Sequence, residues 1–130
     1  MVRAQAVCLD THAVVWAYAG DVTRFGKEAL ALIEHASLII SPAVLLELQL
    51  LHEIKRIAPT GTAVFEALRT SIGLELADDG FDHVVRSALG ESWTHDPFDR
   101  LIVAHARLLG VPLITRDRRI TSAYSDCRWD

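Results

Sequence analysis

The sequence predicts an α/β fold, a three-layer α/β/α sandwich built on a mainly parallel sheet of four or five strands. Short apolar runs of strand length alternate with longer segments of helical periodicity, which is the pattern of successive β–α units. The first runs are continuously apolar, as expected of parallel strands buried on both faces. The length, undivided by repeats or linkers, predicts one domain over residues 1–130.

The first half of the chain contains two strands and three helices in this interpretation. An apolar run of four residues ends at Asp10, and the segment after it has helical spacing. A second apolar run leads to Ser41 and Pro42, a serine suited to cap a helix and a proline suited to its first position. The expected elements are a strand over 6–9, helices over 11–18 and 25–35, a strand over 37–40 and a helix from about 43 to 57.

The second half contains the clearest helix start in the chain. Asp96 can cap, Pro97 suits the first helical position, and the apolar periodicity that follows stops at Gly110. A buried strand then ends in Thr115 and Asp117. The expected elements are a helix over 62–71, a strand over 73–77, a helix over 81–89, the helix over 97–109, a strand over 111–115, a helical turn from 117 and a short edge strand over 127–129.

The composition excludes several classes of protein. Hydrophobic residues make up 51% of the chain and charged residues 23%, which is typical of a globular protein and not of a disordered one. No apolar run approaches the ~18 residues of a membrane span, and no signal peptide precedes the first strand, so we expect a soluble cytoplasmic protein. Cys8 and Cys127 lack motif spacing and are expected to be free thiols.

The charge balance restricts how the protein could bind nucleic acid. The net charge is −4, whereas proteins that bind nucleic acid through counterion release are usually basic. A nucleic-acid role would therefore need metal ions or a local cluster of basic residues. The 11 arginines, against 2 lysines, could supply forked phosphate donors where they cluster.

Three carboxylates fall where ligands bind in parallel sheets. Asp10 ends the first strand, Asp99 lies in the first turn of the late helix, and Asp117 follows the fourth strand. Strand ends and the helix starts that follow them share one edge of an open α/β sheet, and ligands bind at this edge. Each acid also has an ordinary role open to it, because Asp10 and Asp117 can cap helices and Asp99 can complement a helix dipole.

Glu47 is a fourth acid in an unusual position. Its neighbours three and four residues away on the expected helix are all apolar, so it is a lone acid on an apolar face. Burying a charge without a partner is costly, so Glu47 requires a cation, a proton or a solvent edge. A buried pair with an arginine is the structural alternative.

The four acids together predict a metal site. Two unit charges about 4 Å apart repel by about 4 kcal/mol at an effective dielectric near 20. Hard divalent cations relieve such repulsion, and ligands that are all oxygen suit Mg²⁺ or Mn²⁺ better than zinc. A metal held by carboxylates can activate water and stabilise a phosphodiester transition state. The residues therefore indicate metal-dependent phosphodiester hydrolysis.

Four segments resemble the motifs of PIN domains, and most closely those of VapC-type toxins of type II toxin–antitoxin pairs. The resemblance runs through nearly the whole chain in order and spacing, and its most specific part is the Asp-Pro-Phe-Asp-Arg segment. The four segments are Leu9-Asp10-Thr11-His12, Ser41-Pro42 with Glu47, Asp96-Pro97-Phe98-Asp99-Arg100 and Leu113-Ile114-Thr115-Arg116-Asp117.

The resemblance implies a PIN-like fold and an endoribonuclease that depends on Mg²⁺ or Mn²⁺. It also implies an RNA substrate, a cognate antitoxin protein and a homodimer, with no membrane partner. Thr115 would take the family's supporting hydroxyl position, and Asp96 is first a helix cap and second a supporting residue near the metal. The residues implied as catalytic and metal-binding are Asp10, Glu47, Asp99 and Asp117.

One residue departs from the family pattern. Related toxins often carry a histidine two residues before the aspartate of Asp-Pro-Phe-Asp-Arg, where this chain has Thr94, and His95 comes one residue later. We therefore assign His95 no role in the site and expect a loop histidine that contacts backbone. His12 is equally open to a role in packing.

Three other functions can be compared with the residues that each would need. A haloacid-dehalogenase-like phosphatase needs a second aspartate two residues after Asp10 and a late lysine, but position 12 is His and the last lysine is Lys55. A PIN-domain nuclease without an antitoxin stays open. So does a non-catalytic PIN-like module that binds RNA or protein, although the complete set of four acids argues against it.

Overall fold

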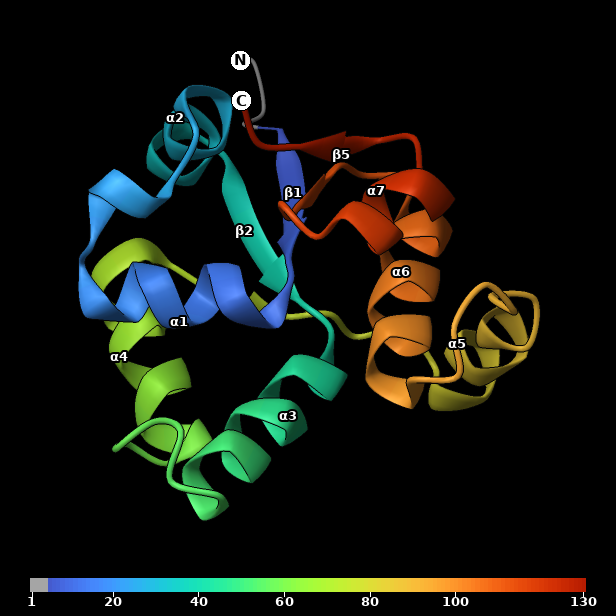
Figure 1. Ribbon diagram of the computed structural model, residues 1–130, viewed down its shortest axis with the longest axis horizontal. Coiled ribbons are helices and arrows are strands. Elements are labelled where there is room, and N and C mark those ends of the chain that lie inside the picture. The colour runs from blue at the N-terminus through green and yellow to red at the C-terminus, as the bar shows by residue number, and fades with distance from the viewer. Residues whose placement is uncertain (1–4) are drawn as a thin grey trace.

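The computed structural model describes residues 5–130 and shows a five-stranded sheet flanked by helices (Figure 1). All four strand pairings are parallel, so the expected α/β class with a mainly parallel sheet is confirmed. The strand order is β3-β2-β1-β4-β5. The strands are β1 (Ala6–Leu9), β2 (Ser37–Ile40), β3 (Glu75–Leu76), β4 (Leu113–Ile114) and β5 (Cys127–Arg128).

The first strand lies in the middle of the sheet, and this order decides where a site can form. Cys8 of β1 is in register with Ile39 of β2 on one side and with Leu113 of β4 on the other. The connections therefore leave β1 in opposite directions, and a crevice opens beyond the carboxyl ends of β1 and β4. Asp10 stands at this point, and its amide donates to the Ile114 carbonyl at 3.2 Å.

Four helices begin at the positions that the capping residues in the sequence predicted. Asp10, Ser41, Asp96 and Asp117 each accept a hydrogen bond from a backbone amide of the first turn that follows. Such caps satisfy amides that have no partner within the helix. The helices are α1 (Thr11–Ala19), α2 (Lys27–His35), α3 (Pro42–Glu53), α4 (Gly61–Ile72), α5 (Phe81–Ala88), α6 (Pro97–Leu109) and α7 (Arg118–Ala123), with a short 3-10 helix over Val22–Arg24.

The core forms between the central strands and the helices that cover them. Val7 and Leu9 of β1 and both residues of β4 are fully buried, and α6 adds Ile102 and Val103. Burial of each such side chain stabilises the fold by roughly 1.5–3 kcal/mol. Cys8 and Cys127 are free thiols, as expected. Within residues 5–130, no helix is both long and apolar enough to cross a bilayer.

One expected helix and one expected strand are shorter than predicted. The helix predicted from about 43 to 57 ends at Glu53, because Lys55 takes a left-handed conformation (φ 64°) and His52 Nδ1 lies 2.9 Å from the Ala58 carbonyl, which holds the turn. This turn returns Ile57 to the core. The third strand is also shorter than the range 73–77, because only Glu75–Leu76 pair with β2.

The helix predicted over 25–35 begins two residues late, at Lys27. Phe25 is extended and its ring packs 5.4 Å, centroid to centroid, from Trp129. A Cβ on Gly26 would lie 2.2 Å from the Trp129 carbonyl oxygen, so the carboxyl-terminal segment leaves room only for glycine. The same oxygen accepts a hydrogen bond from the Ala29 amide at 3.0 Å. A contact between the two ends of the chain therefore determines where α2 begins.

Candidate active site

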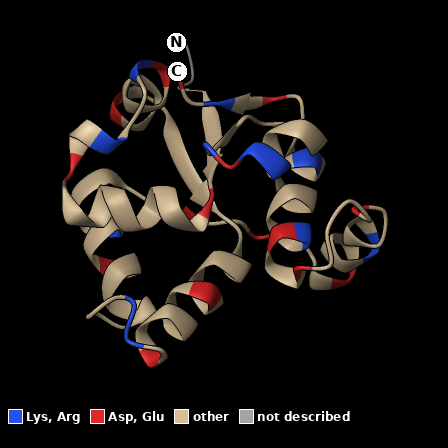
Figure 2. Ribbon diagram, in the orientation of Figure 1, with Lys and Arg blue, Asp and Glu red and all other residues tan. Residues whose placement is uncertain are grey.

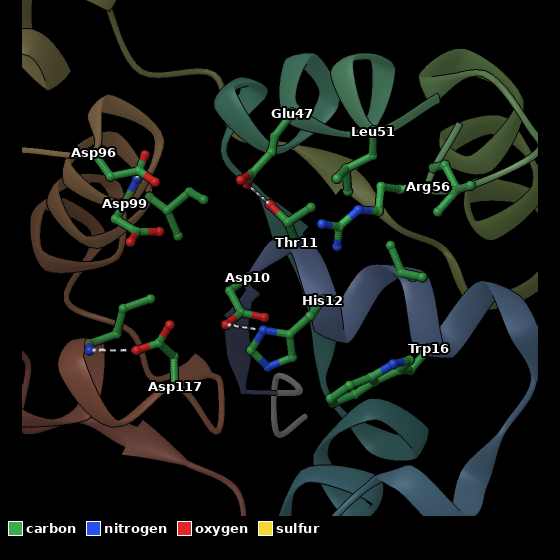
Figure 3. Close-up of a pocket in the computed structure, with 14 residues that line it drawn as sticks. Asp10, Thr11, His12, Trp16, Glu47, Leu51, Arg56, Asp96, Asp99 and Asp117 are labelled. Atoms are coloured by element: carbon green, nitrogen blue, oxygen red, sulfur yellow. Dashed lines mark hydrogen bonds and ion pairs between the residues drawn. The ribbon is translucent and has the colours of Figure 1, made fainter. Parts of the chain in front are cut away.

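Five carboxylates from four parts of the chain line one cavity of about 440 Å³ (Figure 3). They come from the end of β1, the middle of α3, the start of α6 and the start of α7. The structure therefore brings together every acid that the sequence singled out. The five are Asp10, Glu47, Asp96, Asp99 and Asp117.

Asp10 is the most buried and the most firmly held of these acids. It is 3% exposed, and its Oδ1 accepts the Ala13 amide at 3.0 Å while its Oδ2 accepts the Thr115 hydroxyl. Thr115 Oγ1 in turn accepts the Asp117 amide at 3.0 Å. Asp10 thus both caps α1 and faces the cavity, so its two predicted roles are compatible. Thr115 thus links the end of β1 to the segment after β4 through its hydroxyl.

His12 is a member of this network that sequence reasoning did not place. Its Nδ1 lies 3.1 Å from Asp10 Oδ2, and its Nε2 accepts the Arg116 amide at 3.4 Å. Burial lowers the pKa of His12 to about 4, although the charge of Asp117 raises it in part. The ring is therefore neutral at pH 7, with its proton on the Nδ1 that faces Asp10. The spacing of two residues in Asp10-Thr11-His12 was the available signal.

Glu47 is partnered by a hydroxyl and not by an arginine. Thr11 Oγ1 donates to Glu47 Oε1, and no ion pair within residues 5–130 includes Glu47. Burial raises the pKa of Glu47, the Thr11 hydrogen bond lowers it, and the charge of Asp96 raises it further. The charge of Glu47 is therefore left without a counter-charge inside the protein, as its apolar helix face suggested.

Asp96 and Asp117 are positioned by their capping bonds. Asp96 Oδ1 accepts the amides of Phe98 at 2.8 Å and Asp99 at 3.2 Å, which confirms its role as a cap. Asp117 Oδ1 accepts the amides of Arg119 and Ile120 at 2.8 and 3.2 Å. In each case Oδ1 holds the helix start, and Oδ2 accepts no hydrogen bond from the residues that the structure describes.

The acids disfavour one another's ionisation. Burial raises the pKa of Asp10 to about 8 against the hydrogen bonds from Thr115 and Ala13, and the charges of Asp117 and Asp99 add to the rise. A buried carboxyl surrounded by like charges favours its neutral form for both of these reasons. At pH 7 the cavity therefore contains negative charge that the protein does not fully neutralise.

Asp99 shows the same effect in a more open position. Burial, followed by the charges of Asp96, Asp117 and Glu47, raises its pKa to about 6, and Arg119 lowers it in part. Perturbed carboxyls that meet in a cleft mark a candidate functional site.

The donor set fits a hard divalent cation in its chemistry. All donors are carboxylate and hydroxyl oxygens, and Mg²⁺ and Mn²⁺ prefer such ligands. Within residues 5–130, no group of three or more His, Cys, Asp or Glu side chains lies close enough together to hold a metal ion. The carboxylates line a shared cavity without closing around a single point.

The residues before α6 lie outside this network. His95 is exposed, it does not line the cavity, and the expected contact with backbone is absent from the hydrogen bonds of residues 5–130. Thr94 is buried and structural, because its Oγ1 accepts the Asp96 amide at 3.1 Å and its carbonyl accepts Arg100 Nε at 2.7 Å. The loop thus orients the start of α6.

The far end of the cavity is apolar and cationic. Trp16, Leu51 and Arg56 lie there, away from Asp99 and Asp117 (Figure 3). Sequence reasoning did not identify Arg56 as a site residue, because it follows the end of α3 and reaches the cavity only through the turn at Lys55.

Comparison with known families gives one match that covers most of the chain. The family model described as "PIN domain" matches residues 7–125. No curated protein gives a significant match.

Solved structures with a similar fold come from bacteria and archaea. VapBC2 from Rickettsia felis, bound to a DNA fragment from its promoter, has a TM-score of 0.66 at 17% identity and covers 97% of this chain and 100% of that one. PAE2754 from Pyrobaculum aerophilum has a TM-score of 0.62 at 18% identity and covers 95% and 88%. A domain of a functionally unknown protein from Methanocaldococcus jannaschii has a TM-score of 0.58 at 19% identity and covers 92% and 83%.

Proposed function

This chain belongs to the PIN domain family, and from that membership we propose that it is an Mg²⁺- or Mn²⁺-dependent endoribonuclease, the toxin of a toxin–antitoxin pair. PIN domains are generally nucleases, and they usually use divalent metal ions. The observation that carries the proposal is the set of five carboxylates around one cavity at the carboxyl edge of β1 and β4. Such a set can hold a cation against a phosphodiester.

Four acids are proposed to hold the metal. Asp10, Glu47, Asp99 and Asp117 would bind it, and a bound Mg²⁺ or Mn²⁺ would supply a Lewis acid for the phosphodiester and charge to offset the carboxylates. Thr115 holds Asp10 from the β4 side through its hydroxyl. Thr11 holds Glu47 in the same way from α1. These two hydroxyls orient the carboxylates toward the cavity without adding charge.

The toxin role rests on the four motifs together with the fold. VapBC2, which has the same fold, is a toxin–antitoxin complex bound to promoter DNA, and this likeness supports an antitoxin partner here. A homodimer is supported by an apolar hollow of about 360 Å³ between α3, α5 and α6. Two side chains at its rim, Leu46 and Phe81, are 56% and 77% exposed. Exposed apolar patches of this kind mark interaction surfaces.

Cleavage of a pool of cellular RNAs tests the proposed activity. We expect cuts at defined sites with Mg²⁺ or Mn²⁺ that disappear with EDTA and in Asp99→Asn. Asp82→Asn is the matched control, because Asp82 lies in the first turn of α5 as Asp99 does in α6 but is exposed and paired with Arg86. Full activity of Asp99→Asn, or activity that survives EDTA, would contradict the proposal.

A non-catalytic PIN-like module is the second candidate. It is favoured by one observation, that the acids are not closed around a common point. Titration of the folded protein with Mn²⁺ separates the two functions. Binding that is lost in Asp10→Asn supports the nuclease, and absence of binding at millimolar Mn²⁺ supports the module. Expression beside the neighbouring reading frame would show whether an antitoxin exists.

A further inference from the structure

The arginines of this chain fall into two groups by their partners. Within residues 5–130, five arginines lie within 4.0 Å of a carboxylate, and Arg100 donates to the Thr94 carbonyl. The remaining four have no carboxylate within 4.0 Å among the described residues. These four are Arg56, Arg116, Arg118 and Arg119.

The unpaired arginines gather beside the acidic cavity. Arg56 lines the cavity itself, and the other three lie on α7 and the loop before it. Figure 2 shows the basic segment around the start of α7 near the acidic segments at the starts of α1 and α6. A protein of net charge −4 thus places the four unpaired arginines of residues 5–130 in or next to an acidic cavity.

A second groove, of about 800 Å³, opens on the other side of this loop. Arg116 and Arg118, both exposed, line it together with Trp129 and Arg128. Glu28 and Asp130 also line the groove. Arg128 is 2.9 Å from Asp126 and 3.9 Å from Glu28, so its charge is already offset. The free positive charge of the groove therefore comes from Arg116 and Arg118.

The groove and the acidic cavity share one wall. Thr115 and Arg116 line the groove, and the next residue, Asp117, lines the cavity. The Arg116 guanidinium lies 5.5 Å from the centre of the Trp16 ring, and Trp16 lines the cavity. This cation–π contact holds Arg116 where the two hollows meet. A chain bound at the acids would therefore pass onto the arginines.

We propose that this groove binds the phosphate backbone of the RNA segment next to the cleaved bond, through Arg116 and Arg118. Arginine matches phosphate because its planar fork donates two parallel hydrogen bonds. Without a metal ion the acidic cavity repels RNA, so metal-independent affinity for the substrate must come from contacts outside it. The inference rests on the proposed ribonuclease function and adds a phosphate-binding site that is separate from the acids.

Salt dependence of binding tests the site directly. A fluorescent, unstructured oligoribonucleotide of mixed sequence is titrated in EDTA, which prevents cleavage, at several salt concentrations. The logarithm of the binding constant for a single strand falls as the logarithm of the salt concentration rises, and each phosphate contact makes this slope steeper by about 0.7. In the double variant Arg116→Gln/Arg118→Gln we expect the slope to become shallower by about 1.4. The same loss of two contacts corresponds to about 25-fold weaker binding at 0.1 M salt.

A charge-matched control separates a site from a general loss of charge. Arg69→Gln/Arg86→Gln removes the same charge from two exposed helices, where each arginine pairs with a neighbouring acid. This control is expected to keep the slope and the affinity of the unmodified protein. All four side chains are exposed, so we expect both double variants to fold, and circular dichroism checks this.

The outcomes distinguish this inference from the proposed function. If the protein cleaves RNA but the groove variant binds and cleaves as the control does, the groove inference is wrong and the ribonuclease stands. If RNA is neither bound nor cleaved, both are wrong. If poly-glutamate binds through these arginines and RNA does not, the groove takes an acidic protein segment instead. A higher KM with unchanged kcat in the groove variant supports the inference.

Discussion

Replacing Asp10 by Asn should stabilise the metal-free protein while it removes activity. Asp10 is almost fully buried, and burial raises its pKa to about 8. Because Asp10 ionises more readily in the unfolded chain, its ionisation lowers the free energy of unfolding. Asn keeps the carbonyl oxygen that accepts the Ala13 amide, and the Thr115 hydroxyl can accept from the new amide. The change thus removes the charge and keeps these two contacts, although His12 Nδ1 loses the oxygen that lies 3.1 Å from it.

The magnitude follows from the two pKa values. A carboxyl with a folded pKa above its unfolded value binds more protons in the folded state, so stability falls as pH rises from the unfolded pKa to the folded one. The unfolded value is about 3.9, and each pKa unit is worth about 1.4 kcal/mol. The contribution of Asp10 to the stability of the metal-free protein should therefore fall by on the order of 4 kcal/mol between pH 4 and pH 7 and level off above pH 8, so the difference from Asp10→Asn should grow over this range.

Urea unfolding in EDTA, followed by tryptophan fluorescence from pH 4 to pH 9, measures this effect. The unmodified protein and Asp10→Asn should be similarly stable near pH 4, and the variant should become more stable by several kcal/mol at pH 8. Asp82→Asn, at an exposed position, should track the unmodified protein. Parallel curves for the unmodified protein and Asp10→Asn at every pH would refute the argument.

Four further results are expected. Saturating Mg²⁺ should stabilise the unmodified protein by about 2.7 kcal/mol at 100 times Kd but leave Asp10→Asn unchanged, measured as the shift in urea midpoint. Cleavage should decline as pH falls from about 8 through about 6, where Asp10 and then Asp99 protonate, because metal binding needs carboxylates; a flat profile from pH 5 to 8 would argue against this. Thr11→Val should reduce Mn²⁺ affinity by freeing Glu47 while the fold survives, which calorimetry would detect, and unchanged affinity would count against this. Phe81→Ser should convert a dimer to a monomer in light scattering without a change in circular dichroism, whereas a dimer that persists would place the interface elsewhere.

Much of the fold could be predicted because its signals are local. The capping residues Asp10, Ser41, Asp96 and Asp117 marked four helix starts, since a cap acts within one turn of its own helix. Continuous apolar runs marked β1 and β2 as buried parallel strands. The start of α2, by contrast, depends on a distant segment. Gly26 precedes α2 in an extended conformation, and Trp129, more than a hundred residues later in the chain, packs against it.

The sequence by itself determined which acids could serve one site and which chemistry they suit. The type and spacing of Asp10, Glu47, Asp99 and Asp117 relative to strand ends carry that information, because parallel strands present their carboxyl ends at one edge. Only the tertiary structure decided how these acids are held and what surrounds them. Thr11 meets Glu47 and Arg116 meets Trp16 across long stretches of chain. Such contacts depend on how helices pack, and no local pattern records that packing.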